Sequence, residues 1–367
     1  MKRHALLFFL LALLLLISSC TFSSSKPQRD ISLYHNIHAL DFDSAADNLL
    51  LLAYDGKNNE LVRYQSGKAT CLATLPAADG LPPAISFEHL YFDEANGHLF
   101  VQERDVKGFQ TYGVACYDLA GKFLWRMDVA DYPSIVALPE NGGYVLCNSA
   151  LIGASTFTLL DTSFNIIGEY TSDAFYSPSL LQNDTEGTLF AASTVDFLDR
   201  HFQFSRFLAK ISSDGTITYG DSLPAYPSLF FDFAGVRYFV GMSILDEYMQ
   251  LDTGMTAFGT DAVCTIDSAL HLTEICQLSF DDKWFRTKAV FPTADKLYLV
   301  GLLIDIHSEN VEVIRILEIT SDWKISIVQD VPCYAYFDFL AAEMTDTSFS
   351  IIGMENDKIV HYIAEQK

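Results

Sequence analysis

The most regular feature of the chain is a strand–turn–strand pattern of hydrophobic and polar residues that recurs along its length. Each copy is a short apolar run, a turn rich in Asp, Asn or Gly, and a second apolar run. Apolar runs bounded by such turns are typical of buried β-strands joined as hairpins. The pattern predicts a chain built from β-hairpins, with almost no helix.

Seven copies of the hairpin follow one another. Their first strands begin at His38, His89, Ile135, Ser179, Leu229, Ala289 and Tyr336. The starts are roughly 45 to 60 residues apart, and several copies carry a second turn at a similar offset, such as 118–122 and 161–165. This period, with two hairpins in a repeat, is the mark of a β-propeller whose blades are four-stranded sheets.

The predicted fold class is therefore all-β, with residues 30–367 forming a single β-propeller of seven four-stranded blades. Six or eight blades are the alternatives, because a count of hairpins easily errs by one. We expect the segment from Asp30 to Tyr34 to supply the fourth strand of the last blade. Such a strand would close the ring and leave no sheet edge open.

The first twenty residues follow a different pattern. Lys2 and Arg3 precede an unbroken apolar run at 5–17, and two serines stand before Cys20. This is the order of a secretory signal, and the run is shorter than the roughly 20 residues that a helix needs to cross a bilayer. We predict a cleaved signal peptide at 1–19, followed by a polar tether at 20–29.

The segment Ile17-Ser18-Ser19-Cys20 resembles the lipobox of bacterial lipoproteins. The resemblance implies cleavage before Cys20 and attachment of a diacylglycerol and a further acyl chain, such as palmitate, to that residue. Several chains, each gaining about 0.8 kcal/mol per buried methylene, hold a protein firmly on a membrane. The expected location is the cell envelope, outside the cytoplasm. In a Gram-negative host it would be the outer membrane, because Thr21 stands where an aspartate would favour inner-membrane retention. A plain secretory signal with an incidental cysteine is the alternative.

Composition narrows the possible partners. Hydrophobic residues make up 50% of the chain and charged residues 19%, which is enough apolar material for a large core. The net charge of −24 opposes binding to nucleic acid or to anionic lipid headgroups. The expected partners are the membrane, through the lipid anchor, and a protein or an extracellular polymer.

Six cysteines remain once Cys20 is lipidated, and an even number outside the cytoplasm permits disulfides. They are Cys71, Cys116, Cys147, Cys264, Cys276 and Cys333. Cys264 and Cys276 flank a predicted hairpin, so a disulfide between them is a possible link. Most of the six lie in strand-like runs, where cysteine commonly acts as a small buried hydrophobe.

One repeat carries a second resemblance. Residues 114–125 contain a turn with Asp118, Gly121 and Lys122 ahead of Trp125. This repeat is similar to those of the propellers related to quinoprotein dehydrogenases, which include a bacterial lipoprotein that is a scaffold in outer-membrane protein assembly. The resemblance implies the propeller fold, but it does not imply a quinone, and we expect no cofactor.

Motifs for catalysis and metal binding give no strong candidate. His35, His38, Asp41 and Asp43 are close in sequence. Residues three apart in a strand point to opposite faces, so we expect no metal site there. The patterns Gly-x-Ser-x-Gly and His-Glu-x-x-His and a phosphate-binding glycine loop are absent. The sequence therefore assigns no catalytic residue, and it leaves enzymatic activity open while favouring a binding role.

Two connections between the predicted second and third strands are longer than the others, at 194–206 and 243–261. Neighbouring blades would bring them together on one face, and long loops on a rigid scaffold commonly carry binding groups. Equivalent connections of two other blades add two further residues. The candidate binding face consists of Arg104, Asp199, Arg200, His201, Phe202, Tyr248, Met249 and His307. The alternative is that the long connections are tolerated surface insertions.

These features together predict a membrane-anchored, exported lipoprotein whose propeller is a binding or scaffolding module for a protein or a polymer. The alternative is a propeller enzyme that acts on a carbohydrate or another small substrate in the central funnel. The first hypothesis rests on the long connections, and the second rests on the channel that a propeller encloses.

Overall fold

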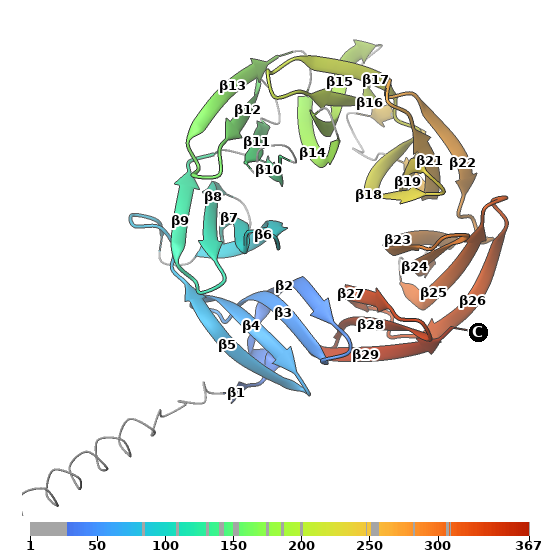
Figure 1. Ribbon diagram of the computed structural model, residues 1–367, viewed down its shortest axis with the longest axis horizontal. Helices are drawn as coiled ribbons and strands as arrows, with labels where there is room; N and C mark the ends of the chain where they lie inside the picture. Colours follow the sequence, from blue (N-terminus) through green and yellow to red (C-terminus); the bar gives the residue numbers. More distant parts are fainter. Residues whose placement is uncertain are drawn as a thin grey trace, which may run out of the picture.

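The computed structural model describes residues 28–82, 85–107, 110–129, 132–138, 143–149, 154–173, 176–184, 187–198, 201–246, 248–250, 257–281, 283–305, 308 and 310–366. Cys20, Asp199, Arg200 and His307 lie outside the described residues. In the described part, seven sheets stand as blades around a central channel (Figure 1). The prediction of an all-β chain that forms a single seven-bladed β-propeller is confirmed. No helix among the described residues is long and apolar enough to cross a membrane.

The first three blades follow in chain order, and each runs from an inner strand at the channel to an outer strand at the rim (Figure 1). Blade 1 consists of β2 (His35–Asp43), β3 (Asn48–Tyr54), β4 (Asn59–Gln65) and β5 (Lys68–Leu75). Blade 2 consists of β6 (Ile85–Asp93), β7 (His98–Asp105), β8 (Thr111–Asp118) and β9 (Phe123–Met127). Blade 3 consists of β10 (Tyr132–Ala137), β11 (Tyr144–Ser149), β12 (Ser155–Leu160) and β13 (Ile166–Ser172).

The remaining four blades complete the ring. Blade 4 consists of β14 (Tyr176–Asp184), β15 (Gly187–Leu198), β16 (His201–Ile211) and β17 (Ile217–Ser222). Blade 5 consists of β18 (Ala225–Phe233), β19 (Val236–Asp246), β21 (Ala257–Ile266) and β22 (Leu272–Gln277), and the short β20 (Tyr248–Gln250) precedes β21. Blade 6 consists of β23 (Lys283–Pro292), β24 (Lys296–Asp305), β25 (Val311–Thr320) and β26 (Ile325–Pro332). Blade 7 consists of β27 (Asp338–Met344), β28 (Ser348–Glu355) and β29 (Lys358–Glu365).

The hydrophobic core is divided among the junctions between neighbouring blades. Successive side chains of a strand point to opposite faces of its sheet, so each blade packs against the preceding and the following blade. In β11, for example, Leu146 lies in the cluster between blades 2 and 3, whereas Val145 lies in the cluster between blades 3 and 4. Full burial of such a side chain stabilises the fold by about 1.5–3 kcal/mol. This two-sided burial explains why the strands read as nearly continuous apolar runs.

Aspartate side chains fix the turns that the sequence predicted between third and fourth strands. The Asp118 carboxylate accepts hydrogen bonds from the amides of Ala120 and Lys122 at 2.9 and 2.8 Å. The Asp161 carboxylate accepts equivalent bonds from Ser163 and Asn165, both at 2.8 Å. A short acidic side chain that bonds to its own turn favours this conformation before any tertiary contact forms. These turns are therefore a local property of the sequence.

The inner strands of six blades carry a β-bulge at an equivalent place. At each bulge, one extra residue stands without a cross-strand partner, and this displaces the strand locally. The extra residues are Leu40, Leu90, Leu181, Ser228, Lys288 and Leu340. Four of the six are leucines, and the two polar exceptions belong to the neighbouring blades 5 and 6.

The ring closes differently from the prediction. Residues 30–34 do not form a strand of blade 7. Ile31–Leu33 instead form a short 3-10 helix, η1, and the Asp30 carboxylate caps its start by accepting a hydrogen bond from the Ser32 amide. Gln28–Arg29 form β1, which pairs with the outer strand β5 of blade 1. The folded body thus includes the last two residues of the predicted tether, and blade 7 has three strands among the described residues. Ile31 and Tyr34 are buried between blades 7 and 1, so packing closes the ring there.

Candidate functional site

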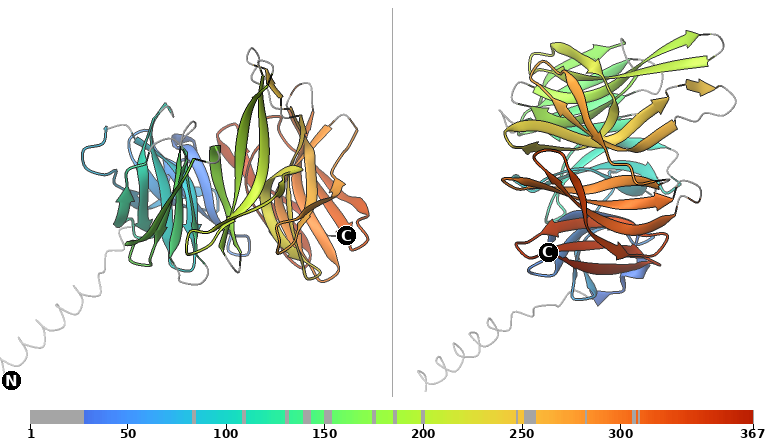
Figure 2. Two further views of the ribbon diagram at one scale, coloured as in Figure 1. Left: turned by 90° about the horizontal axis from the view of Figure 1, so that it is seen from above. Right: turned by 90° about the vertical axis from the view of Figure 1, so that its right-hand side faces the viewer.

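The two long connections of blades 4 and 5 meet in one projecting sheet. Strands β15 and β16 are 12 and 11 residues long and extend beyond the body of the propeller on one face (Figure 2). Strand β20, from the connection between β19 and β21, pairs antiparallel with the start of β16. We call the sheet formed by the ends of β15 and β16 together with β20 the projecting sheet. As the sequence suggested, neighbouring blades bring their long connections together.

The register of the projecting sheet shows which candidate residues it joins. In β16 and β20, Phe202 is paired with Met249, His201 with Gln250, and Gln203 with Tyr248. Eleven residue pairs join β15 to β16, and the pairing runs without a break from Thr188 and Ile211 to Leu198 and His201. Four of the eight candidate residues therefore lie in one continuous strand pair. Asp199, Arg200 and His307 are outside the described residues.

Arg104 does not belong to this sheet. It lies in β7 of blade 2, so that blade 3 separates it from the projecting sheet (Figure 1). Its guanidinium forms an ion pair with Glu88 of the inner strand β6, with Nη1 and Oε2 2.6 Å apart. The two side chains are 25% and 38% exposed, so this pair contributes little to stability. The sequence grouped Arg104 with the long connections because it occupies an equivalent position in its own blade, and equivalent positions in different blades need not lie close together.

A cleft between the inner parts of blades 5 and 6 is lined by both apolar and charged side chains. Its volume is about 380 Å³, within the range of small-molecule sites. One wall is apolar, from Leu229, Met242, Leu302 and Ile304. Polar and charged side chains line the rest of the same cleft. They are Ser228, Asp261, Arg286, Thr287 and Lys288.

Asp261 and Arg286 form a buried ion pair at the back of this cleft. Arg286 Nη1 lies 3.3 Å from Asp261 Oδ1 and 2.6 Å from the Gly259 carbonyl oxygen, to which it donates. The other Asp261 oxygen accepts the Thr287 amide at 2.6 Å. Burial raises the pKa of Asp261 and lowers the pKa of Arg286, in each case against the effect of the partner's charge. Desolvation therefore exceeds the attraction between the two charges, as is common for buried pairs.

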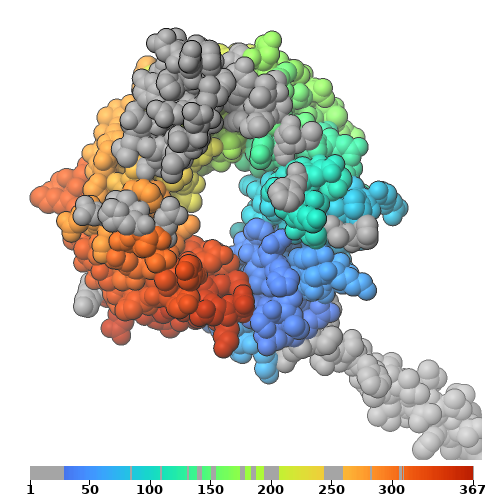
Figure 3. All heavy atoms as spheres, turned by 180° about the vertical axis from the view of Figure 1, so that it is seen from behind, coloured from blue at the N-terminus to red at the C-terminus, as the bar shows by residue number. Residues whose placement is uncertain are grey.

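The cleft adjoins the central channel at Lys288. A second hollow of about 360 Å³ is lined by β2, β23 and β27 and includes Asp41, Phe42, Leu340 and Lys288. Figure 3 shows that the channel is open through the ring. Lys288 is exposed and lines both hollows, so a molecule that enters from the channel would meet its ammonium group. Among the described residues, no three His, Cys, Asp or Glu side chains are placed to hold a metal ion.

Two histidines lie on the inner strands of blades 1 and 2. The Nε2 atoms of His38 and His89 are buried without a hydrogen-bond partner. Burial, and then repulsion from His38, lower the pKa of His89 to about 4. Burial also lowers the pKa of His38, although Glu88 and Asp338 oppose this effect. Both imidazoles are therefore neutral in the folded protein at neutral pH.

Acidification should destabilise the fold through His89. An unfolded histidine has a pKa near 6.5, so between about pH 6.5 and pH 4 the unfolded state binds the proton and the folded state does not. Stability is fully present above that range and falls as pH drops through it, by roughly 3 kcal/mol for His89 in total. Urea unfolding of His89→Leu should show a flatter pH dependence there, and His271→Leu, an exposed control, should keep the native slope. Equal slopes in the two variants would contradict this expectation.

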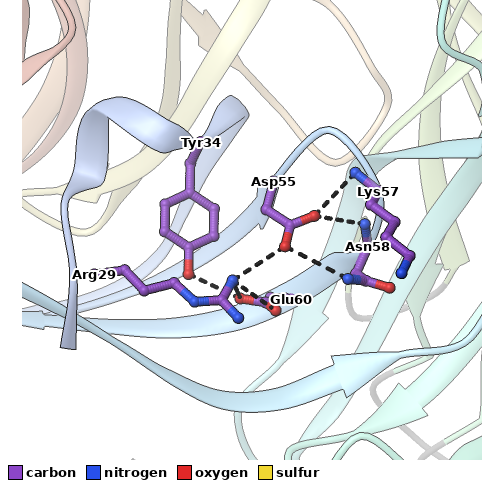
Figure 4. Close-up of polar contacts among 6 residues, drawn as sticks. All are labelled: Arg29, Tyr34, Asp55, Lys57, Asn58 and Glu60. Carbon is purple, nitrogen blue, oxygen red and sulfur yellow. Dashed lines mark hydrogen bonds and ion pairs between the residues drawn. The ribbon is translucent and has the colours of Figure 1, made fainter. Parts of the chain in front are cut away.

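A partly buried polar cluster fastens the start of the described chain to blade 1 (Figure 4). Arg29 Nη1 lies 3.0 Å from Asp55 Oδ2 and 3.2 Å from Glu60 Oε1. The Tyr34 hydroxyl donates to Glu60 Oε2 at 2.8 Å, and the Glu60 side chain is only 2% exposed. Burial and Glu60 raise the pKa of Tyr34, which stays protonated and can donate. Residues 28–34 thus form a latch that joins the N-terminal segment to blade 1 and covers its junction with blade 7.

The six described cysteines are free thiols. Cys264 is paired with Glu274 in the register of β21 and β22, and Cys276 is paired with Val263. Cys264 packs between blades 4 and 5, whereas Cys276 packs against the cluster between blades 5 and 6. The two thiols therefore lie on opposite faces of blade 5, an arrangement that does not favour the disulfide considered from the sequence. Cys116, Cys147 and Cys264 are fully buried among apolar side chains.

The sequence analysis missed Asp261, Arg286 and Thr287. A usable signal was present for Asp261, because it is a charged residue inside the otherwise mostly apolar run of β21. The carboxylate in such a run requires a partner if the strand is buried on both faces. No local pattern connects it to Arg286, which is 25 residues further on and in the next blade.

Comparison with known proteins places the chain in a fold class. It matches no protein-family model and no curated protein. Its overall arrangement is that of a β-propeller, and many solved structures share it. The class that the fold defines is therefore the seven-bladed β-propeller, with no narrower family shown.

Three solved structures illustrate how distant these likenesses are. The β-propeller domain of the Trilobed protease from Pyrococcus furiosus, described as having an open velcro topology, has a TM-score of 0.49 and 9% identity, covering 91% of this chain and 96% of that chain. The polysaccharide lyase Uly1 has a TM-score of 0.49 and 9% identity, covering 91% and 90% of the two chains. A mutant of the Synechocystis apocarotenoid oxygenase has a TM-score of 0.46 and 13% identity, covering 93% and 88%. Such likenesses concern the arrangement of strands and carry nothing about activity.

Proposed function

We propose that the protein is an exported lipoprotein, anchored through Cys20 at a membrane of the cell envelope, whose propeller binds a protein or an extracellular polymer. The observation that carries this proposal is the pairing of β20 with β16, which joins two blades in the projecting sheet. Two tolerated insertions would have no need to pair with each other. Their pairing holds candidate binding residues in fixed register, which lowers the entropy lost on binding.

The position of the latch supports the proposed anchoring. Strand β1 enters at blade 1, and the β15–β16 hairpin lies on the other side of the ring (Figure 1). A tether that leaves the body at blade 1 would keep the projecting sheet away from its own attachment point. The acidic chain would not be drawn to anionic lipid, so the acyl chains would supply the attachment.

The cleft favours binding over hydrolysis as the role of the inner surface. Glycoside hydrolysis generally uses two carboxyl groups that flank the scissile bond. Among the described residues that line the cleft, Asp261 is the one carboxylate, and it is held by Arg286 and the Thr287 amide. An enzyme that acts on a carbohydrate in the funnel remains the alternative function.

In-cell photocrosslinking tests the proposed binding face, and fractionation of a Cys20 variant tests the proposed anchor. A photoreactive amino acid at Phe202 or at Tyr248 should capture the same partner, identified by affinity capture and mass spectrometry. The matched control is Asp214, in the turn after β16 and so at the opposite end of the same strand. Crosslinks of equal yield from Asp214, or none from Phe202 and Tyr248, would contradict the binding face.

In the same cells, Cys20→Ala should lose acyl labelling and move to the soluble fraction, and retention in the membrane fraction would contradict the anchor.

A further inference from the structure

The repeats of the propeller provide an internal comparison for the cleft between blades 5 and 6. The bulge residue of the inner strand is leucine in blades 1, 2, 4 and 7. In blades 5 and 6 it is Ser228 and Lys288, and these two residues line the same cleft. The bulge itself occurs in six blades and holds leucine in four of them, so the fold does not require a polar residue there. The polar exceptions are confined to one junction.

The buried aspartate is a second departure at the same junction. Counted in register from the bulge, the third-strand residues of the five other blades with a bulge are Leu61, Val114, Leu208, Ile314 and Ile359. Blade 5 has Asp261 at this position, with its side chain 3% exposed. A buried ion pair is weak evidence for stability, and well-packed apolar residues often do as well. Five equivalent positions in this chain show that apolar residues suffice for the fold.

The Thr287 hydroxyl and the Lys288 ammonium are two further groups in the cleft that could bond to a ligand. Thr287 is 6% exposed, and its hydroxyl lies close to the Asp261 carboxylate without forming a hydrogen bond of good geometry. A buried, unsatisfied hydroxyl lowers stability, so its presence in a lined hollow points to a ligand. The ion pairs formed by the described side chains of blades 5 and 6 do not include Lys288. Since Arg286 is matched by Asp261, the ammonium of Lys288 gives the cleft a net positive charge.

We propose that this cleft binds a small hydroxycarboxylate, such as an acidic sugar. Lys288 would pair with the carboxylate at the mouth of the cleft, because a cationic ligand would be repelled there and a neutral one would leave the ammonium unmatched. Ser228 and Thr287 supply hydroxyls for the hydroxyl groups of the ligand, and Met242 and Leu302 contact its carbon skeleton. The ion pair behind them holds Arg286 and the Thr287 backbone in place. This site is separate from the projecting sheet and does not depend on its proposed function.

Thermal-shift and calorimetric titrations of the full propeller test the site. The probes are glucuronate and gluconate, with glucose as the uncharged match and inorganic phosphate as an anion without a carboxylate. Both carboxylates should raise the melting temperature, and glucose and phosphate should not. Lys288→Leu, which installs the residue that four other blades carry, should weaken glucuronate binding about tenfold or more, because a charge-assisted bond is lost. Lys122→Leu, an exposed lysine in blade 2, should leave binding unchanged.

The substitution Thr287→Val distinguishes a role of the Thr287 hydroxyl in ligand binding from a role in folding. Removal of an unsatisfied hydroxyl should raise the melting temperature of the ligand-free protein and at the same time reduce the shift that glucuronate produces. A purely structural threonine would not show this opposite pair of changes. The proposal is overturned if neither carboxylate shifts the melting temperature, if glucose or phosphate matches them, or if Lys288→Leu binds glucuronate as the native chain does.

Discussion

Replacing Arg286 with methionine is expected to lower the free energy of unfolding by about 3–5 kcal/mol. The substitution leaves the carboxylate of Asp261, whose side chain is 3% exposed, buried without its counter-charge. Methionine keeps much of the packing volume, so the loss comes from the stranded charge rather than from a cavity. Urea unfolding at neutral pH measures it, and the deficit should shrink on acidification because protonation removes the uncompensated charge.

The matched control removes both charges. In the double variant Asp261→Asn with Arg286→Met, the asparagine side-chain oxygen still accepts the Thr287 amide, and no buried charge remains. We expect its free energy of unfolding to lie within about 1–2 kcal/mol of the native value. A double variant as unstable as Arg286→Met alone would mean that lost packing, not the stranded carboxylate, accounts for the effect. Recovery in the double variant would show that the fold does not need the pair.

Replacing Tyr34 with alanine should lower the free energy of unfolding by about 3–5 kcal/mol. Tyr34 is 4% exposed and fills the junction between blades 7 and 1, where packing closes the ring. Its loss also removes the hydroxyl that donates to Glu60 in the latch. Urea unfolding measures the change, and limited proteolysis should cut the N-terminal segment earlier than in the native chain.

Two controls divide this effect into its parts. Tyr34→Phe keeps the ring and removes only the hydroxyl, and because Glu60 still accepts from Arg29, we expect a loss of about 1–2 kcal/mol. Tyr336→Ala removes a tyrosine that is 73% exposed and should change stability by less than about 0.5 kcal/mol. If Tyr34→Ala were no more harmful than Tyr336→Ala, the latch would have no part in closing the ring.

The blades were predictable because their causes are local or periodic. Strands such as β11 are apolar on both faces, and each hairpin turn carries its own aspartate or glycine, as Asp118 and Asp161 illustrate. Both signals are visible in a short window of sequence. The meeting of the two long connections also followed from the repeat, since consecutive blades must be neighbours in the ring. Even so, the pairing of β20 with β16 could not be read from either connection alone.

The prediction failed for one short segment, residues 30–34, which could interact with either blade 7 or blade 1. Residues 30–34 were expected to extend blade 7, but a side-chain bond from Asp30 begins a 3-10 turn, and Arg29 is held by Glu60 of blade 1. The competing interactions differ by only a few hydrogen bonds, which no sequence pattern ranks. Arg104 was grouped with the long connections for a different reason: it is equivalent to them in the repeat, but it lies in blade 2 and not beside the projecting sheet.

The sequence by itself determined the class of structure, through repeated apolar strands, turns stabilised by their own side chains and a period typical of propeller blades. The tertiary structure alone decided how the ring closes, which thiols share a face, and that Asp261 meets Arg286 across a junction between blades. The physical reason is the range of the interactions. Strand and turn preferences act within a few residues, whereas the cleft and the latch depend on burial and charge pairing between segments that become neighbours only when the blades pack.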